Sequence, residues 1–455
     1  VTSIGDIPSL KLMQEKGDIQ IKGKSFKAVW SGHSGTLSSL VYRGEEVIHQ
    51  GYGPRLNVYR AFVDNDKWFR GTFETAGLDE LIYTVRDIQA KQISNDIVRV
   101  QIVTDCLASG KEGCGFTHTA LYTVFGTGWM DVQYNITPYG SIPLLPKIGV
   151  QMMVSSDFET FTWLGRGPHE SYVDRRRSAD VGLYQGTAGQ QYEEYVRPQE
   201  NGSKTDVRWA ALTDRSGRGV MVIMDGLYSA SALHFTAKDL NDAKNIHRLR
   251  PREEIVLCID AVHMGLGGAS CGPRPMKQYC FSPGSLQMRY TLCPVRERNV
   301  KEMAEQARTL MPVPAAATIT DTKVKKADGE GHCRQITLSG PADAEIVYWF
   351  DDLSGEKTPQ MYTGPFVFDR AGVVYAQARA KNGIAGLPVQ AAYKAFIDLL
   401  DVDKQDWKIA YVDSEEPDEG PAINTIDGKP GTYWHTNWAT TKDPMPHEIQ
   451  VDLGK

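Results

Sequence analysis

Short runs in which apolar and polar residues alternate recur along this chain, and most of them end in a glycine-rich or polar turn. Ile97 to Val103 alternates over seven residues, and Tyr122 to Tyr134 contains two such runs around a glycine-rich turn. Alternation with a period of two places apolar side chains on one face of a strand. The runs at 220–226 and 255–260 are apolar enough for buried strands. Many short strands separated by turns predict an all-β architecture, a sandwich or a barrel.

One helix is expected before the first domain boundary. Residues 297–311 contain good helix formers with apolar residues at helical spacing, and Pro312 and Pro314 then end the helix and begin a linker. We therefore predict a first domain over 1–295, and a helix and linker over 296–316. Residues 317–398 have the length and short strands of a small immunoglobulin- or fibronectin-like sandwich. Residues 399–455 are too few to bury a core alone, so the chain is expected to end inside a domain.

Composition excludes several classes of function. The net charge of −6 provides no basic surface for nucleic acid, and no run of about 18 apolar residues is present that would span a membrane. The seven cysteines include no Cys-x-x-Cys pair, which argues against a zinc or redox site. The amino terminus has neither a signal-peptide pattern nor an initiating Met, so the chain is expected to begin within a longer protein.

The densest group of chemically capable side chains lies between Trp163 and Arg177. Glycine and proline predict an irregular loop there, and loops on a rigid β scaffold often carry binding residues. An aromatic ring beside carboxylates and guanidinium groups suits a sugar, because the ring covers the apolar face and the charged groups bind hydroxyls. A network of salt bridges that merely holds a long loop is the alternative interpretation. The candidate carbohydrate-binding residues in this segment are Trp163, Arg166, His169, Glu170, Tyr172, Asp174 and Arg175.

Two further polar segments are candidates, 64–66 and 197–202. Asp64, Asn65 and Asp66 are consecutive acceptor-rich residues that suit either an oxygen-liganded cation or an Asx-turn network, and the turn is favoured. Glycosidases use paired carboxylates, but neither Glu170 nor Glu200 ends a predicted barrel strand. No catalytic residue is therefore assigned.

Five motifs in the same order resemble the C-terminal domain of the large β-galactosidases of glycoside hydrolase family 2, also called the small-chain domain. They begin at Arg60, Leu145, Trp163, Pro198 and Asp260, and the resemblance extends from about Ile19 to Val295. The resemblance implies an antiparallel super-sandwich similar to that of galactose mutarotases. It also implies a retaining parent enzyme whose two catalytic glutamates lie in a barrel outside this chain. On this basis, the domain packs on the barrel of its own parent chain and shapes the substrate pocket.

The same resemblance adds His263, within the last motif, to the pocket candidates. It also exposes a departure. The family's best-known member has a tryptophan platform for the substrate where this chain has Val256, and a second aromatic residue is replaced near Gly272. A valine cannot stack on a sugar ring, so the identity of the saccharide is open.

The carboxy-terminal segments resemble modules appended to bacterial glycosidases. Residues 317–398 are similar to fibronectin or chitobiase C-terminal modules, and 399–455 to the start of a discoidin (coagulation-factor type C) carbohydrate-binding domain. In that family a structural calcium often occupies the Asp-Gly loop, which makes Asp427 and Thr432 candidate ligands. No other cofactor is expected. The modules imply a bacterial protein in a periplasmic, secreted or cell-surface setting.

Together these patterns predict a non-catalytic segment of a β-galactosidase whose partners are β-galactoside-containing glycans and its own barrel. Two alternatives are a stand-alone lectin-like module and a mutarotase-like aldose epimerase. The epimerase would pair a glutamate base with a histidine acid, and His169 and Glu170 are neighbours. Adjacent residues on a strand point to opposite faces, so such a pair requires the loop to bend.

Overall fold

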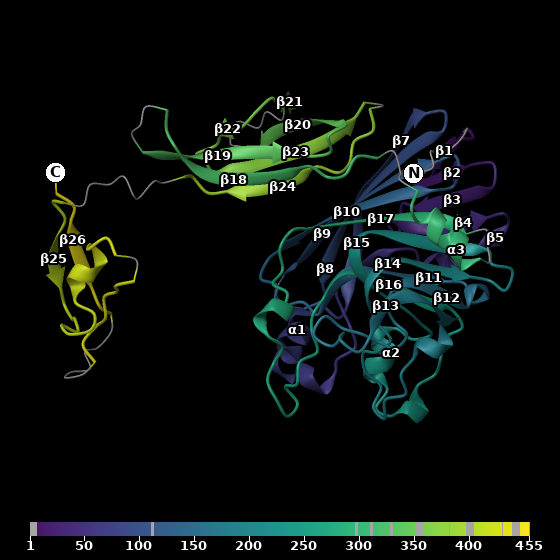
Figure 1. Ribbon diagram of the computed structural model, residues 1–455, viewed down its shortest axis with the longest axis horizontal. Coiled ribbons are helices and arrows are strands. Elements are labelled where there is room, and N and C mark those ends of the chain that lie inside the picture. The colour runs from purple at the N-terminus through teal and green to yellow at the C-terminus, as the bar shows by residue number, and fades with distance from the viewer. Residues whose placement is uncertain are drawn as a thin grey trace. The chain divides into compact units, whose positions relative to one another are not determined.

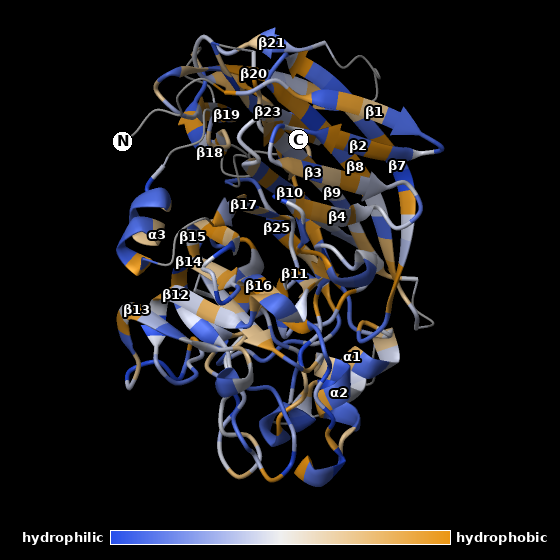
Figure 2. Ribbon diagram, turned by 90° about the vertical axis from the view of Figure 1, so that its right-hand side faces the viewer, coloured by the Kyte–Doolittle hydropathy of each residue, from blue (hydrophilic) through white to orange (hydrophobic). Residues whose placement is uncertain are grey.

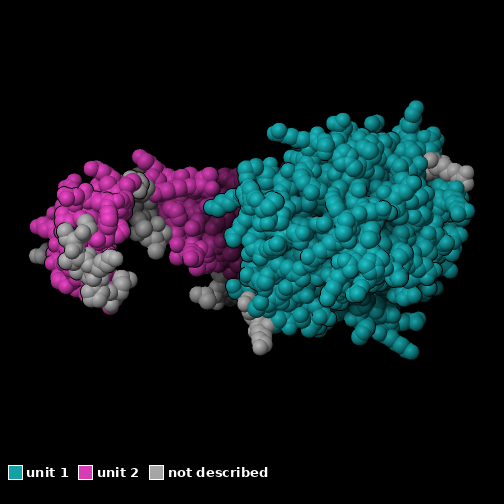
Figure 3. Space-filling view, turned by 90° about the horizontal axis from the view of Figure 1, so that it is seen from below, with its two compact units in different colours: residues 1–316, 341–345, 377–389 teal, residues 317–340, 346–376, 390–455 magenta. Residues whose placement is uncertain are grey.

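The computed structural model describes residues 7–110, 113–295, 299–309, 313–327, 331–351, 358–381, 383–396, 405–429, 431–438 and 446–454. The chain divides into two compact units. Unit 1 contains residues 1–316, 341–345 and 377–389, and unit 2 contains 317–340, 346–376 and 390–455 (Figure 3). Figure 1 shows that strands dominate both units.

Unit 1 begins with a five-stranded antiparallel meander in the order β1-β2-β3-β4-β5. Its strands are β1 (Lys11–Glu15), β2 (Asp18–Lys22), β3 (Phe26–Ser31), β4 (Thr36–Tyr42) and β5 (Glu45–Glu46). Buried and exposed residues alternate along β2 and β3, as the predicted period of two requires. Figure 2 shows hydrophobic and hydrophilic residues interleaved along these strands.

The second sheet of unit 1 has twelve strands and carries the candidate site. Its main path runs β13-β12-β14-β15-β17-β10-β9-β8-β7, and β11 joins it through β16 while β6 pairs with β11. The amino-terminal strands are β6 (Arg55–Asn57), β7 (Leu81–Ser94), β8 (Ile97–Ala108), β9 (Gly115–Phe125), β10 (Met130–Tyr139) and β11 (Lys147–Val154). The later strands are β12 (Thr160–Gly167), β13 (Asp180–Thr187), β14 (Lys204–Thr213), β15 (Gly219–Leu233), β16 (Ile255–His263) and β17 (Leu286–Val295).

Strand β15 connects two parts of this sheet. Its first half, 219–224, pairs with β17, and its second half, 229–233, pairs with β16. Glycine permits a close approach nearby, because a Cβ on Gly149 in β11 would collide with the carbonyl oxygen of Ile259 in β16. The main core joins both sheets, and Trp30 of the meander meets the ring of Tyr122 edge-on at 5.3 Å between centroids.

Among the described residues, the α-helices are α1 (Arg70–Ala76), α2 (Ala237–Asp242) and α3 (Val300–Gln306). The helix predicted over 297–311 thus appears as the shorter α3, with Asn299 as its N-cap. Part of the predicted range, 297–298 and 310–311, lies outside the described residues. Met303 of α3 packs on Trp209 and Cys293 of the large sheet.

Unit 2 is also built from antiparallel strands. A three-stranded sheet contains β18 (Thr318–Lys325), β19 (His332–Ser339) and β22 (Phe366–Val367). A four-stranded sheet contains β20 (Ala344–Asp351), β21 (Gln360–Met361), β23 (Gly372–Ala380) and β24 (Val389–Tyr393). Of its residues, 344–345, 377–380 and 389 are assigned to unit 1. A last antiparallel pair is β25 (Lys408–Val412) and β26 (Ile449–Asp452).

The predicted all-β class is therefore confirmed. Among the described residues no helix is both long and apolar enough to cross a membrane. The boundaries at 295, 316 and 398 remain predictions, although the division into units also falls at 316.

Candidate functional site

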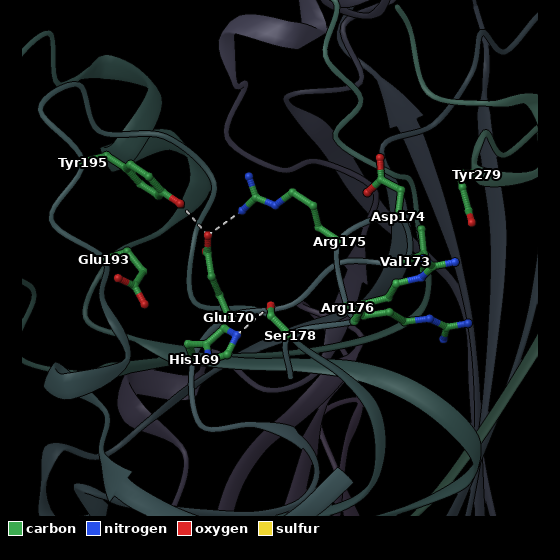
Figure 4. Close-up of a pocket in the computed structure, with 11 residues that line it drawn as sticks. His169, Glu170, Val173, Asp174, Arg175, Arg176, Ser178, Glu193, Tyr195 and Tyr279 are labelled. Carbon is green, nitrogen blue, oxygen red and sulfur yellow. Dashed lines mark hydrogen bonds and ion pairs between the residues drawn. The ribbon is translucent and has the colours of Figure 1, made fainter. Parts of the chain in front are cut away.

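The polar segment singled out in the sequence begins inside β12, so Trp163 and Arg166 are strand residues and not part of the expected loop. The rest of the segment forms the loop between β12 and β13, which follows a cis peptide bond between Gly167 and Pro168 and in which Tyr172 and Arg175 pair. The loop borders an open cavity of about 810 Å³ in unit 1. Figure 4 shows the side chains that line it. They come from the loop itself (His169, Glu170, Val173, Asp174, Arg175, Arg176, Arg177 and Ser178) and from Glu193, Tyr195 and Tyr279.

Glu170 is the best-connected carboxylate of this cavity. It accepts hydrogen bonds from the Arg175 guanidinium at 2.8 Å, from the hydroxyls of Tyr172 and Tyr195, and from the backbone N–H of Gly202 at 3.0 Å. Only 8% of its side chain is exposed. Its acceptor positions are therefore already occupied, and the carboxylate ties the loop to the turn at 201–202.

His169 and Glu170 do not form a pair. The Nε2 atom of His169 lies 3.0 Å from the hydroxyl of Ser178, whereas Glu170 contacts Arg175 and the tyrosines. Figure 4 shows the two contacts as separate dashed lines. The acid–base pair that an epimerase would need is thus not assembled from these two residues.

Arg166 and Asp174 tie the loop to neighbouring segments. The guanidinium of Arg166 binds Asp206 and the carbonyl oxygens of Arg176 and Ala179. Asp174 accepts hydrogen bonds from the backbone N–H groups of residues 266 and 267 at 3.0 and 2.7 Å. Both side chains therefore position backbone, which is the structural alternative considered from the sequence.

Trp163 was expected to cover a sugar face, but its side chain is only 2% exposed. The ring stacks on Phe161 at 5.0 Å, and its Nε1 donates to the carbonyl of Arg166. The ammonium of Lys204 lies over the ring at 5.2 Å. A ring enclosed in this way has no free face for a saccharide, so the expectation for Trp163 is corrected. Tyr172, which is fully buried, is corrected for the same reason.

Lys204 is a buried cation that sequence patterns did not indicate. Its side chain lies in β14 and is almost fully buried. Burial lowers the pKa of Lys204 to about 8, although Glu170 and Glu193 act in the opposite direction.

Asp64, Asn65 and Asp66 point to different partners. Asp66 is buried against Arg60 at 2.8 Å, and its other oxygen accepts from the backbone N–H of Val63. Asn65 binds residues 267 and 270, whereas Asp64 is 61% exposed. Three groups that diverge in this way form a turn network, the interpretation favoured from the sequence. Within the described part of the chain, no three His, Cys, Asp or Glu side chains gather as metal ligands would.

The recognised motifs meet in a buried network of charges. The ammonium of Lys147 lies 3.3 Å from Asp260, and Nε2 of His263 lies 3.4 Å from Glu200. Glu200 also accepts from the backbone N–H of Ala61. Burial alone would raise the pKa of Glu200, but His263, Lys147 and Arg60 together lower it. His263 is buried and does not line the loop cavity, but it does line a smaller neighbouring cavity of about 240 Å³.

Val256, at the position of the family's tryptophan platform, is also buried. It packs with Met153 and Cys258, and Tyr52 lies against this cluster. The absence of an aromatic ring at 256 is therefore compatible with the local packing. Tyr52 is the nearest aromatic residue of the cluster.

In unit 2, the candidate calcium ligands lie together. The hydroxyl of Thr432 lies 2.9 and 3.0 Å from the two oxygens of Asp427, 2.8 Å from the carbonyl oxygen of Lys429 and 3.5 Å from that of Asn424. One hydroxyl has a single proton to donate, so it cannot satisfy four acceptors. Carboxylate, hydroxyl and carbonyl oxygens are the ligand types that Ca²⁺ prefers. The residues present fit this ion.

Comparison with known proteins identifies the class to which this strand-rich domain belongs. Residues 22–293 match the family described as "Beta galactosidase small chain". This match covers more than half of the chain, and the chain belongs to that family.

Individual relatives carry the same name. The chain is 31% identical over 267 residues to a β-galactosidase of Priestia megaterium. The aligned region covers 57% of this chain and 25% of the relative. It is 28% identical over 284 residues to a β-galactosidase of Actinobacillus pleuropneumoniae, and this aligned region covers 62% of this chain and 27% of the relative. The chain thus spans about a quarter of the length of the curated relatives it matches.

Solved structures with overlapping folds include a galactose 1-epimerase from Lactobacillus acidophilus and an aldose 1-epimerase homologue from Caenorhabditis elegans. The first has a TM-score of 0.39 at 9% identity and covers 63% of this chain and 98% of the other. The second has a TM-score of 0.34 at 10% identity, with coverage of 63% and 99%. Overlaps of this size carry no argument about activity.

Proposed function

We propose that this chain is the non-catalytic C-terminal segment of a retaining β-galactosidase of glycoside hydrolase family 2, and that it shapes the substrate pocket. The family match and the relatives named β-galactosidase support the parent activity. The catalytic glutamates belong to a barrel elsewhere in the parent protein, which is also the principal partner of unit 1.

The observation that carries the non-catalytic role is the state of the two candidate glutamates. A general acid or nucleophile must reach the scissile bond with a free oxygen. Glu170 is held by four donors, and Glu200 is buried between His263 and a backbone N–H. Both carboxylates support loops.

The experiment is an assay of the 455-residue chain on a chromogenic β-galactoside. We expect no turnover above that of a Glu170→Gln, Glu200→Gln double variant, because neither residue acts in catalysis. Turnover by the chain at an ordinary enzymatic rate that is lost in the double variant would overturn the proposal.

Carbohydrate binding by the loop cavity is the second candidate function. The cavity of about 810 Å³ lies within the size range of small-molecule sites. Arg177 and His169 are exposed at its edge, and Arg177 has no ion-pair partner among the described residues. Guanidinium groups donate hydrogen bonds to hydroxyl oxygens and can bind a carboxylate through two such bonds.

This binding is tested by calorimetric titration of the chain with galactose and lactose. Arg177→Ala is expected to weaken binding, whereas Arg215→Ala, an exposed arginine in the turn between β14 and β15, leaves it unchanged. Equal affinities for the wild type and both variants would remove the loop cavity from the proposal.

The remaining assignments are also proposals. Residues 317–398 act as a fibronectin-like module and 399–455 as part of a discoidin-like carbohydrate-binding module, with Ca²⁺ held by Asp427 and Thr432. Such appended modules suit a bacterial enzyme that acts on glycans in the periplasm or outside the cell.

A further inference from the structure

Three consecutive arginines line one part of the loop cavity. Arg175, Arg176 and Arg177 lie in the loop between β12 and β13, and all three residues are exposed. Figure 4 shows Arg176 on the opposite side of the cavity from Glu193. The run matters for binding only if part of its positive charge remains uncompensated by carboxylates.

Most of the carboxylates near these arginines are already occupied. Glu170 binds Arg175 and three further donors. The two oxygens of Asp174 each accept a backbone N–H group. Asp206 is shared, because it binds Arg176 at 3.0 Å and Arg166 as well. One carboxylate thus serves two guanidinium groups.

Arg177 and Glu193 are the charged lining residues whose side chains have no hydrogen-bond or ion-pair partner among the described residues. Burial lowers the pKa of Lys204, and Glu170 and Glu193 act against that shift. The buried ammonium of Lys204 therefore compensates part of the charge of Glu193. Within the described part of the chain, no carboxylate lies within ion-pair distance of Arg177.

The charged groups of this region do not balance. The lining residues and the charged side chains that interact with them include five cations and four carboxylates. The cations are Arg166, Arg175, Arg176, Arg177 and Lys204, and the carboxylates are Glu170, Asp174, Glu193 and Asp206. The excess positive charge is located at Arg177 and at Arg176, which shares its carboxylate with Arg166.

We propose that the loop cavity binds an acidic saccharide, whose carboxylate or sulfate group contacts Arg176 and Arg177. Guanidinium groups recognise such oxyanions through paired N–H donors. Val173 and Tyr279 also line the cavity and offer apolar contact area to the sugar ring. The inference rests on the proposed carbohydrate binding by this cavity, and it adds the chemical class of the saccharide.

The test is isothermal titration of the 455-residue chain with galactose, galactose 6-sulfate, galacturonic acid and sodium sulfate. We expect at least one of the two acidic sugars to bind about tenfold or more tightly than galactose, because one charge-assisted contact is gained. This advantage should shrink at high ionic strength, since salt screens exposed charges.

Arg177→Gln removes the charge and keeps a polar side chain. In this variant the affinities for the acidic sugar and for galactose should become nearly equal, whereas Arg177→Lys should retain part of the difference. Arg215→Gln is the matched control, since Arg215 is an exposed arginine in the turn between β14 and β15 and does not line the cavity. Thermal melts check that each variant is folded.

Three results would overturn the inference and leave the proposed carbohydrate binding in place or narrow it. Equal affinities for galactose and both acidic sugars would show that the cavity does not select charge. Inorganic sulfate that binds as tightly as galactose 6-sulfate would show a site for the anion alone. An advantage of the acidic sugars that persists in Arg177→Gln would place their charged group elsewhere. Absence of binding by every ligand would remove both this inference and carbohydrate binding by the loop cavity.

Discussion

At the scale of single residues, identical side-chain types within one motif have different environments. Asp64 and Asp66 are two positions apart, yet Asp64 is 61% exposed and Asp66 is buried against Arg60. Replacing the two residues therefore has different effects on the stability of the fold, because solvent screens the carboxylate of Asp64 and not that of Asp66.

Asp66→Ala is therefore expected to lower the free energy of unfolding by about 3–5 kcal/mol, since it leaves the Arg60 guanidinium buried without its partner. Asp64→Ala is the matched control, with an expected loss of less than about 1 kcal/mol. Urea denaturation of both variants measures the difference. Similar losses in the two variants would contradict the assignment of a buried ion pair.

Lys204 gives a pH-dependent prediction. Its folded-state pKa of about 8 lies below the ordinary value of 10.5, so charging it costs stability. The cost is fully present below pH 8 and disappears as the pH rises through 10.5, because the unfolded chain holds the proton over that interval. The cost corresponds to about 3 kcal/mol.

Lys204→Met removes the charge and keeps the contact with Trp163. We expect this variant to be about 1–3 kcal/mol more stable than the wild type at pH 7, with a gain that shrinks above pH 8. Lys91→Met, on the exposed side of β7, should change stability little at any pH. Denaturation curves at pH 7 and pH 10 provide the measurement, and a pH-independent difference would refute the assignment.

At the scale of elements, loops far apart in the sequence are joined through single side chains. Asp174 connects the loop after β12 to the loop after β16 through the N–H groups of Leu266 and Gly267. Gly267 has a φ of +59°, a conformation that glycine adopts without strain. One carboxylate thus holds a backbone turn in place.

Asp174→Ala should therefore speed amide hydrogen exchange at residues 266 and 267 by at least about tenfold, since two acceptors are lost. Exchange in β9 and β10 should be unaffected because these strands retain their ladder. Asp180→Ala, at the exposed start of β13, is the control. Unchanged exchange at 266 and 267 would show that Asp174 does not hold this turn.

At the scale of the whole molecule, the chain divides into two compact units, and the main hydrophobic core belongs to unit 1. The proposed oxygen ligands Asp427 and Thr432 belong to unit 2, so a cation bound there would stabilise that unit directly.

Addition of Ca²⁺ should raise the unfolding temperature of the unit 2 transition by about 5 °C in scanning calorimetry, and chelation should reverse it. The transition of unit 1 should stay constant. Asp427→Ala should abolish the shift, whereas Asp418→Ala, an exposed carboxylate nearby, should preserve it. A shift that persists in Asp427→Ala would place the ion elsewhere.

The sequence by itself determined the all-β class and the family. Alternation at 97–103 and 122–134 is local, and each strand needs only its own residues to define an inward face. The motifs that begin at Arg60, Leu145, Trp163, Pro198 and Asp260 were sufficient to indicate the β-galactosidase small chain, which the comparison confirmed.

Only the tertiary structure decided which polar residues face a cavity. Tyr195 and Tyr279 reach the loop cavity from distant segments and carry no local motif, whereas one face of Trp163 lies under Lys204 from another strand. The surroundings of Glu170 likewise come from residues 172, 175, 195 and 202. Burial and hydrogen bonding depend on which segments pack together, and a period of two gives the face of a strand without giving what covers it.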